Sequence, residues 1–348
     1  MAENNKRFNS LRNSKFTTDD LTRLQSEDLQ GKFQITLARI MEAYQRTNKQ
    51  CYVSFSGGKD STVLAYISAM ACELLHCKLV LWFSDTGLEF PEVRQHVKDY
   101  GEWLKEKFPT IEIEVISEHP KDRKGNPISF RDVILNEGYP LISKEVALKV
   151  HDAVNNPNGY AAQSFYEGTP KNIKYPKFKL IKYEYLLHAP FRISHKCCDI
   201  MKKRPAKRFE KERHLMPIIG TMACESNARR TEWLKNGCNA FDNDRPISRP
   251  MSFWTEQDVL KFIVLYELPY PSVYGEIKQN ECGVYYATGY ERTGCMYCGF
   301  GCHLEKEPNR FQKLKNTHPK IWEYCMKPVE NGGLGMKEVL EYIDVDIE

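Results

Sequence analysis

The chain has 348 residues, of which 41% are hydrophobic, so it is long enough to bury a full core and falls outside the disordered class. Its net charge of +4 is too small to indicate a nucleic-acid partner by itself. The sequence has no run of about 18 apolar residues and no apolar signal-peptide core near its start, so we expect a cytoplasmic protein with no membrane partner.

The first elements predicted are helical, because apolar residues repeat at a spacing of about 3.6 within residues 1–45. Short β-branched and aromatic runs then alternate with helical patterns. The runs predict strands at 50–55, 78–85 and 111–117, and the patterns predict helices at 62–76 and 91–108. This alternation is typical of an α/β fold with a doubly wound, mostly parallel sheet.

The middle of the chain, residues 118–190, is irregular and rich in Pro, Lys and Tyr, and we predict no elements within it. A basic helix disturbed by Pro205, a buried strand and another helix follow. Thr255 and Asp258 have the spacing of a capping box ahead of an apolar helix. From residue 281 the chain is rich in Gly and Cys, which indicates a separate C-terminal module.

Residues 54–61, SFSGGKDS, lie between a predicted strand and a predicted helix and have the composition of a phosphate-binding loop. Gly57 and Gly58 let backbone N–H groups approach an anion, and the following helix adds the positive end of its dipole. Lys59 adds a point charge on the surface of the turn. The hydroxyls that could donate to phosphate oxygens are those of Ser54, Ser56 and Ser61. A turn that binds no ligand is the alternative.

The segment Ser56–Ser61 resembles the SGGxDS signature of the PP-loop ATP pyrophosphatases, which split ATP into AMP and pyrophosphate. Later segments are similar to motifs of the phosphoadenosine phosphosulfate reductase branch of that superfamily; they are residues 85–91, 220–229 and 250–259. The resemblance implies an adenine nucleotide alpha-hydrolase-like (HUP) fold. It divides the chain into a helical extension (1–45), a nucleotide-binding α/β domain (46–280, with the insertion 118–190) and a Cys-rich, cluster-binding segment with a C-terminal helix (281–348).

The same resemblance implies a nucleotide site in which Lys59, Asp60 and Ser61 are catalytic. The ATP-binding residues that it implies are Ser54, Ser56, Gly57, Gly58, Lys59, Asp60, Ser61, Asp85, Thr86, Gly87, Gly220, Glu225, Ser226 and Arg229. We expect Asp85 to bind a ribose hydroxyl or Mg²⁺, with capping of the next turn as its alternative role. Met222 stands where the branch usually has Arg, so that anion contact is absent or comes from elsewhere. Arg229 and Arg230 are the nearest candidates.

Twelve cysteines in a chain without an export signal indicate free thiols rather than disulfides. Seven are isolated, and we expect them to be small buried hydrophobes; they are Cys51, Cys72, Cys77, Cys224, Cys238, Cys282 and Cys325. The other five form the groups Cys197-Cys198 and Cys295-x-x-Cys298-x-x-x-Cys302. Four thiolates in two pairs suit Zn²⁺ or a [4Fe–4S] cluster, and spacing does not choose between them. Basic neighbours such as Lys202 are expected to lower the thiol pKa values.

The two cysteine groups together resemble the cluster pattern of the assimilatory adenylylsulfate reductases. This resemblance implies a [4Fe–4S] cluster held by Cys197, Cys198, Cys295 and Cys298, with Cys302 as the reserve ligand. A structural Zn²⁺ site and buried cysteines without a metal are the alternatives.

Three hypotheses for function follow. The first is an ATP- and Mg²⁺-dependent sulfurtransferase, which adenylates an acceptor and then inserts sulfur supplied by a cysteine desulfurase or by sulfide. The second is a sulfonucleotide reductase that releases sulfite; against it, the only Glu-Cys-Gly, residues 281–283, lies ahead of the cluster motif and not in a C-terminal tail, and the phosphate loop is complete. The third is a nucleic-acid-binding component without catalysis, because lysines alternate with aromatic residues over 171–185. Nucleic acid is equally a candidate acceptor for the first hypothesis, beside a small molecule.

Overall fold

The structure is a computed structural model that describes residues 14–122 and 124–348. It contains two compact units, and each unit is assembled from three separate stretches of chain. The first unit takes the residues up to Ser84, Phe90–Glu118 and Lys207–Thr293, and the second takes Asp85–Glu89, His119–Ala206 and Gly294–Glu348. The sequence predicted three consecutive segments instead. Residues 1–13 of the first predicted segment, 1–45, lie outside the described part.

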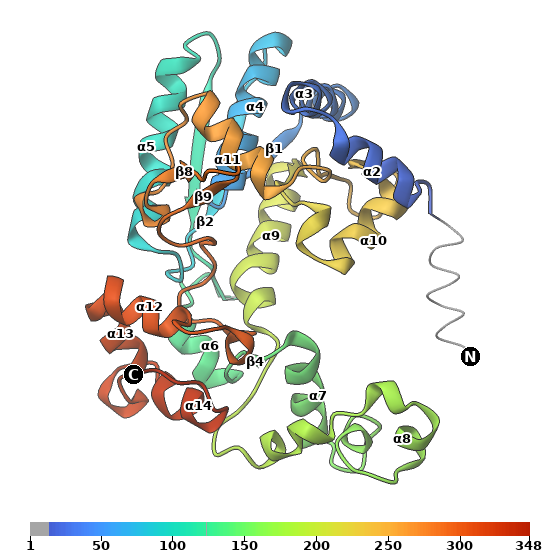
Figure 1. Ribbon diagram of the computed structural model, residues 1–348, viewed down its shortest axis with the longest axis vertical. Helices are drawn as coiled ribbons and strands as arrows, with labels where there is room; N and C mark the ends of the chain where they lie inside the picture. The colour runs from blue at the N-terminus through green and yellow to red at the C-terminus, as the bar shows by residue number, and fades with distance from the viewer. Residues whose placement is uncertain (1–13, 123) are drawn as a thin grey trace. The chain divides into compact units, whose positions relative to one another are not determined.

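A six-stranded sheet forms the centre of the first unit, with the strand order β3-β2-β1-β5-β7-β6. Two of its strands, β1 and β2, are labelled in Figure 1. The strands are β1 (Cys51–Ser54), β2 (Leu79–Ser84), β3 (Ile113–Glu118), β5 (Met216–Ile218), β6 (Asn239–Ala240) and β7 (Ile247–Ser248). Neighbouring strands are parallel except for β6 and β7. Val53 of β1 is in register with Leu81 of β2 and with Ile218 of β5. The predicted α/β fold with a mostly parallel sheet is therefore confirmed.

Helices surround this sheet, and their ends follow local signals in the sequence. They are α2 (Thr18–Ser26), α3 (Leu29–Arg46), α4 (Lys59–Leu75), α5 (Pro91–Lys107), α9 (Arg204–Arg213), α10 (Asn227–Asn236) and α11 (Glu256–Leu265). Pro91 starts α5, and Thr255 with Asp258 forms the predicted capping box of α11. A π-helical turn, Asp199–Lys203, directly precedes α9. Pro205 is the second residue of α9, and it lacks the N–H that a helix interior needs. Beyond α11 come the 3-10 turn Ser272–Tyr274 and the hairpin of β8 (Ile277–Gln279) and β9 (Tyr285–Ala287).

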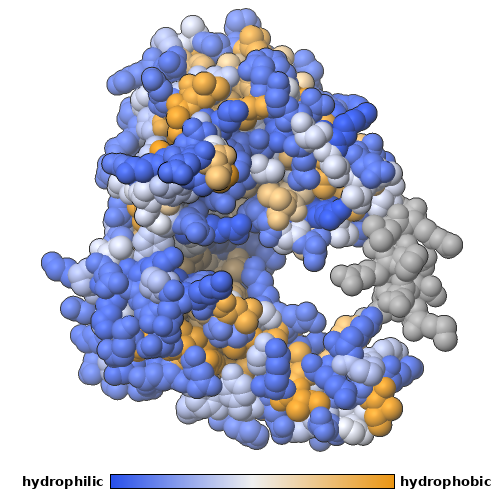
Figure 2. Space-filling view, viewed as in Figure 1, coloured by the Kyte–Doolittle hydropathy of each residue, from blue (hydrophilic) through white to orange (hydrophobic). Residues whose placement is uncertain are grey.

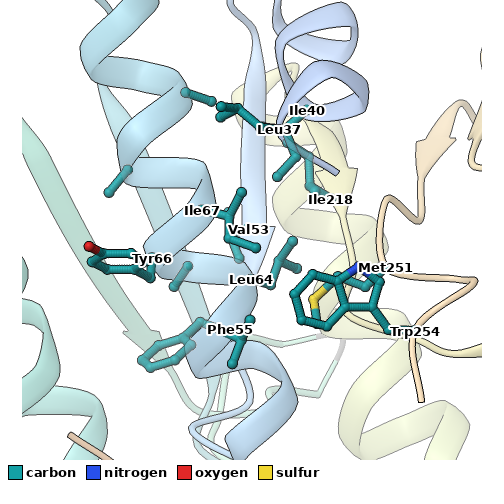
Figure 3. Packing of buried hydrophobic residues seen from close by; sticks show 14 of the residues in the cluster. Leu37, Ile40, Val53, Phe55, Leu64, Tyr66, Ile67, Ile218, Met251 and Trp254 are labelled. Carbon is teal, nitrogen blue, oxygen red and sulfur yellow. The ribbon is translucent and has the colours of Figure 1, made fainter. Parts of the chain in front are cut away.

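The core of the first unit lies where α3, α4 and the sheet meet. Figure 3 shows Leu37 and Ile40 of α3 pointing toward Val53 of β1 and Leu64 and Ile67 of α4. Helix α4 is apolar on most of its circumference and nearly all of it is buried, as expected for a helix covered on more than one side. Its first turn, which carries the phosphate-loop residues, is thus fixed by the packing of the rest of the helix.

The second unit gives structure to the part of the chain that the sequence left unassigned. Its elements are α6 (Phe130–Asn136), β4 (Leu141–Ile142), α7 (Lys144–Asn155), α8 (Pro170–Lys174), β10 (Gly299–Phe300), α12 (Arg310–Thr317), α13 (Pro319–Met326), α14 (Met336–Tyr342) and several 3-10 turns. Strand β10 pairs in parallel with β4, so the CxxC segment is held against the insertion and not in a module of its own. A glycine is needed in β10, because a Cβ on Gly299 would lie 2.7 Å from the Pro140 carbonyl oxygen.

Hydrophilic residues dominate the face of the molecule shown in Figure 2, and hydrophobic residues occupy smaller separate areas on it. Within residues 14–122 and 124–348, none of the helices combines the length and the apolar character that crossing a membrane requires.

Candidate nucleotide site and cysteine cluster

The phosphate loop connects β1 to α4 within the first unit. Gly57 has φ +72°, and a Cβ there would lie 2.7 Å from a methyl carbon of Val97, so both conformation and space require glycine. Gly58 is the N-cap of α4 and has no side chain to accept from the first turn of the helix. The 17-residue helix α4 therefore begins at the loop without a capping side chain. A helix start of this kind, which carries the positive end of the helix dipole, is typical of an anion-binding site.

Lys59 is buried, with 4% of its surface exposed, and does not lie on the surface of the turn as the sequence predicted. Its ammonium donates to the Glu291 carbonyl oxygen at 3.0 Å and lies 3.1 Å from a carboxylate oxygen of Glu256. An oxygen of Asp60 is 3.8 Å away. Burial opposes the charge, but Asp60, Tyr274 and Glu256 outweigh it, so the pKa of Lys59 is raised and the ammonium stays charged.

One carboxylate oxygen of Asp60 accepts no hydrogen bond within the described residues. This oxygen, Oδ1, is buried. Burial raises the pKa of Asp60, whereas the charges of Lys59, Arg292 and Arg229 act in the opposite direction. The Lys59 ammonium lies 3.8 Å from Oδ1, too far for a hydrogen bond, so this oxygen can still accept from a ligand hydroxyl or contact a cation.

The serine hydroxyls of the loop bond to the loop itself. Ser61 donates to the Gly58 carbonyl oxygen at 2.9 Å, and its oxygen is 3.1 Å from that of Ser56. Ser54 is half-buried at the end of β1. The backbone N–H of Lys59 donates to the Tyr274 hydroxyl at 3.2 Å, so a phenol oxygen takes a donor that the loop was expected to offer to phosphate.

The turn between β5 and α10 is held by its own polar groups. Glu225 accepts from the Met222 N–H at 2.8 Å and pairs with Arg229, and Ser226 caps α10 by accepting from the Arg229 N–H. Gly220 lies against the first turn of α4, where a Cβ would be 3.4 Å from the Asp60 carbonyl oxygen. Met222 is 3% exposed and belongs to the core, which explains how an apolar side chain fits where an arginine was expected.

Asp85, Thr86 and Gly87 belong to the second unit, in a turn closed by its own residues. Thr86 donates to Glu89 from both its N–H and its hydroxyl, and Gly87 N–H lies 3.4 Å from an Asp85 carboxylate oxygen. His119 contacts the Asp85 carbonyl oxygen at 2.9 Å. The turn-capping geometry that the sequence offered as an alternative for Asp85 is thus present.

The two cysteine groups meet in the second unit: Cys197 and Cys198 directly precede the π-helical turn, and the second group flanks β10. The thiols of Cys198, Cys295 and Cys298 are near enough to Cys197 for their charges to affect it, and the pKa of Cys197 is raised mainly by burial. Burial also raises the pKa of Cys295 to about 11 and that of Cys302 to about 12. Within residues 14–122 and 124–348, no group of three or more His, Cys, Asp or Glu side chains is arranged to hold a metal ion.

The expectation that basic neighbours lower the thiol pKa values is wrong in its net direction. The charge of Lys202 does lower the pKa values of Cys197 and Cys295. The same ammonium also pairs with the Glu89 carboxylate at 3.4 Å. The removal of the thiols from water is the larger effect, because it disfavours the thiolate.

The isolated cysteines are not all buried. Cys51, Cys72, Cys238 and Cys325 are, as predicted, and Cys77 is half-buried. Cys224 and Cys282 are exposed, which corrects the expectation for these two; they lie in the turn after β5 and at the tip of the β8–β9 hairpin. No sequence pattern distinguishes them, because exposure depends on which segments cover a turn.

Lysines stack on aromatic rings along the insertion. Lys174 lies 5.3 Å from the centre of the Tyr175 ring, and the corresponding distance is 5.0 Å for Lys177 with Phe178 and 4.6 Å for Lys182 with Tyr183. These three lysines are exposed, whereas Lys171 is buried over the Tyr160 ring. Lys171 therefore does not belong to the exposed basic surface that the sequence predicted.

Four groups at the phosphate loop were missed at the sequence level: Glu256, Tyr274, Glu291 and Arg292. They lie about 200 residues after the loop in sequence; Glu256 falls within the motif 250–259 but no role was expected for it, and the other three lie outside the motifs. Only the packing of α11 and the following segment against α4 brings them there.

Residues 168–299 match the phosphoadenosine phosphosulfate reductase domain family, as the sequence motifs led us to expect. The chain is also similar to an uncharacterized protein of Methanocaldococcus jannaschii, with 22% identity over 294 residues. That alignment covers 82% of this chain and 42% of the relative, so the chain spans less than half the length of the curated relative that it matches.

Proposed function

We propose that the protein is an ATP-dependent sulfurtransferase, which adenylates an acceptor with release of pyrophosphate and then exchanges AMP for sulfur. The observation that carries this proposal is the complete phosphate loop: Gly57 in a glycine-only conformation, the helix start at Gly58, and a charged Lys59 beside them. Together these three features suit the binding of a phosphate chain.

The roles proposed for the residues follow from the charge that develops when pyrophosphate leaves. Lys59 and the N–H groups at the start of α4 would bind the β- and γ-phosphates and stabilise that charge. Asp60 Oδ1, which accepts no hydrogen bond in the part of the chain that the structure describes and lies 3.8 Å from the Lys59 ammonium, would be a ligand for Mg²⁺, and the ion would supply charge neutralisation on the phosphate chain. Ser56 and Ser61 would donate to phosphate oxygens in place of their present bonds. For Ser54, Asp85, Thr86, Gly87, Gly220, Glu225, Ser226 and Arg229, the resemblance remains the basis of the proposed nucleotide contacts.

For the cysteines we propose a [4Fe–4S] cluster bound by Cys197, Cys198, Cys295 and Cys298, with Cys302 in reserve and Zn²⁺ as the alternative metal. Four soft donors that affect one another electrostatically support this, because both metals prefer such donors. The side chains must still rearrange to reach a ligating geometry. Sulfur would come from a cysteine desulfurase or from sulfide.

The alternative, a sulfonucleotide reductase, requires a thiol that can attack sulfur. Cys325 is completely buried, so its thiol cannot reach a substrate in this conformation. Cys282, in the Glu281-Cys282-Gly283 sequence, is exposed and is the specific observation in favour of this alternative.

Product analysis separates the two enzymes. Under anaerobic conditions the sulfurtransferase should release pyrophosphate from Mg-ATP when acceptor is present and release AMP when a sulfur donor is added as well. It should release little sulfite from adenylylsulfate or its 3′-phosphate with thioredoxin. Sulfite release that is lost in Cys282→Ser, with ATP left intact, would establish the reductase instead.

Nucleic acid is the acceptor that we propose to test first. Exposed lysines that alternate with aromatic rings can contact phosphates and stack on bases. If nucleic acid binds but ATP is never turned over, the non-catalytic binding component becomes the better description.

A further inference from the structure

The proposed nucleotide site lacks one arginine that related proteins use to bind an anion. Met222 occupies the place where the related branch usually has an arginine, and it is buried in the core, where it cannot contact an anion. Arg229 pairs with Glu225, and Arg230 points elsewhere, since its guanidinium lies 3.4 Å from the Thr18 hydroxyl. Neither arginine expected to replace the missing one is therefore free beside the loop.

A different segment of the first unit, residues 290–293, reaches the loop from the end of the β8–β9 hairpin. The Glu291 carbonyl oxygen accepts from the Lys59 ammonium at 3.0 Å. Thr293 is 3.1 Å from the position that a Cβ on Gly58 would take, and its hydroxyl is 2.7 Å from that of Tyr274. Arg292 lies between these two contacts in the chain and must therefore be at the loop.

The side chain of Arg292 differs from the other cations of the site. It is exposed, and no carboxylate lies within ion-pair distance of it in the described part of the chain, whereas Lys59 has two such neighbours and Arg229 has one. Its charge nevertheless acts on the carboxyl group of Asp60 and on the guanidinium of Arg229, so it lies within electrostatic range of both. A guanidinium held close to another guanidinium, without an acid of its own, is favourable where an anion binds between or across them.

Two oxygen atoms near Arg292 accept hydrogen bonds from the donors that a phosphate would use. The Tyr274 hydroxyl accepts from the first backbone N–H of α4, and the Glu291 carbonyl oxygen accepts from Lys59. Both are oxygen acceptors in the positions where phosphate oxygens would bind a loop of this kind. A bound phosphate would replace them, and Arg292 lies on the same segment, between Glu291 and Thr293, which both contact the loop.

We propose that Arg292 supplies the anion contact that Met222 cannot make, and that its guanidinium binds the β- and γ-phosphates of the nucleotide, the part that leaves as pyrophosphate. This inference rests on the proposed ATP site and adds to it a residue that lies outside the recognised motifs. The ligand class is an inorganic or nucleoside polyphosphate.

Calorimetric titration of the full-length protein with Mg-ATP, magnesium pyrophosphate and AMP tests the inference. Arg292→Gln should weaken the binding of ATP and of pyrophosphate at least tenfold, as expected for a lost charge-assisted hydrogen bond, and change AMP binding less than twofold. Arg292→Lys should restore part of the loss, because it restores the charge without the planar fork. The matched control is Arg230→Gln, which removes an exposed guanidinium from α10 and should bind all three ligands like the parent.

A second measurement uses two exposed thiols of the same unit. The charges of Arg292 and Asp60 act on Cys224, whereas Cys282 lies at the hairpin tip. Mg-ATP should slow alkylation of Cys224, measured by mass spectrometry of its peptide, and leave Cys282 unaffected. In Arg292→Gln this protection should require at least tenfold more ATP.

Failures of the inference and of the proposed function are distinguishable. If Arg292→Gln binds ATP and pyrophosphate as tightly as the parent while Lys59→Met has lost both, the inference is wrong and the ATP site stands. If Arg292→Gln loses AMP as strongly as pyrophosphate, the contact is not to the leaving phosphates, which also overturns the inference. If the parent binds neither ATP nor pyrophosphate, both the inference and the proposed function are wrong.

Discussion

Replacement of Lys59 by Met tests the phosphate loop directly, because it removes the ammonium and keeps an apolar stem of similar length. The stem lies beside the Tyr274 ring, with the ammonium 5.4 Å from the ring centre, so most of its packing should survive. The ammonium itself has two carboxylate neighbours, Glu256 at 3.1 Å and Asp60 at 3.8 Å. One substitution therefore removes a phosphate-binding charge and the counter-ion of two acids.

The expected loss of activity is larger than the expected loss of stability. Loss of one preorganised charge on a leaving group costs about 3–4 kcal/mol of transition-state stabilisation, which corresponds to roughly 10²–10³-fold in turnover. The side chain of Glu256 is 45% exposed and can be solvated by water, and Asp60, whose pKa is already raised by burial, can take up a proton. The free energy of unfolding should therefore fall by only about 1–2 kcal/mol.

Two assays and one control variant complete this test. Pyrophosphate release from Mg-ATP measures turnover, and urea unfolding measures stability. Lys261→Met removes an exposed lysine from α11, the helix that carries Glu256, and should leave both quantities unchanged. A folded Lys59→Met variant with turnover within threefold of the parent would refute the assignment of the loop as the ATP site.

Three further predictions concern stability, metal and acceptor. Burial lowers the pKa of His96 to about 4 from an ordinary value near 6.5. As the pH falls, the imidazole of the unfolded chain is therefore protonated before that of the folded chain. The free energy of unfolding should decrease between about pH 6.5 and pH 4, by up to about 3 kcal/mol. Urea unfolding at several pH values measures this, and an equal slope in His96→Gln would contradict it. Cys197→Ser should lose most of the iron and sulfide bound after anaerobic purification, whereas Cys302→Ser should keep them; a colourless parent protein that carries zinc would exclude the cluster. Replacement of the exposed lysines within residues 174–182 by Gln should weaken nucleic-acid binding and flatten its dependence on salt, as fluorescence anisotropy would show, and an unchanged salt slope would remove this surface from the acceptor site.

Local sequence was sufficient for the elements that surround the candidate site. The strand before the loop, the helix after it and the capping box at Thr255 were all predicted, because periodicity, β-branched residues and cap residues act over a few positions. The glycine requirement at Gly57 belongs to the same class, since its positive φ is a property of the turn itself. The insertion at 118–190 was not predicted because its helices are short, and their stability comes from contacts within the second unit.

The sequence by itself therefore determined the α/β class, the phosphate loop and the cysteines that are candidates for a metal. Only the tertiary structure decided that Lys59 is buried against Glu256, that Tyr274 accepts from the helix start, and that the segment carrying Arg292 reaches the loop. It also decided the net direction of the thiol pKa shifts, which basic neighbours alone would have reversed. The physical reason is the same in each case: burial and contacts between distant residues depend on which segments pack together, and a local pattern carries no information about its distant partner.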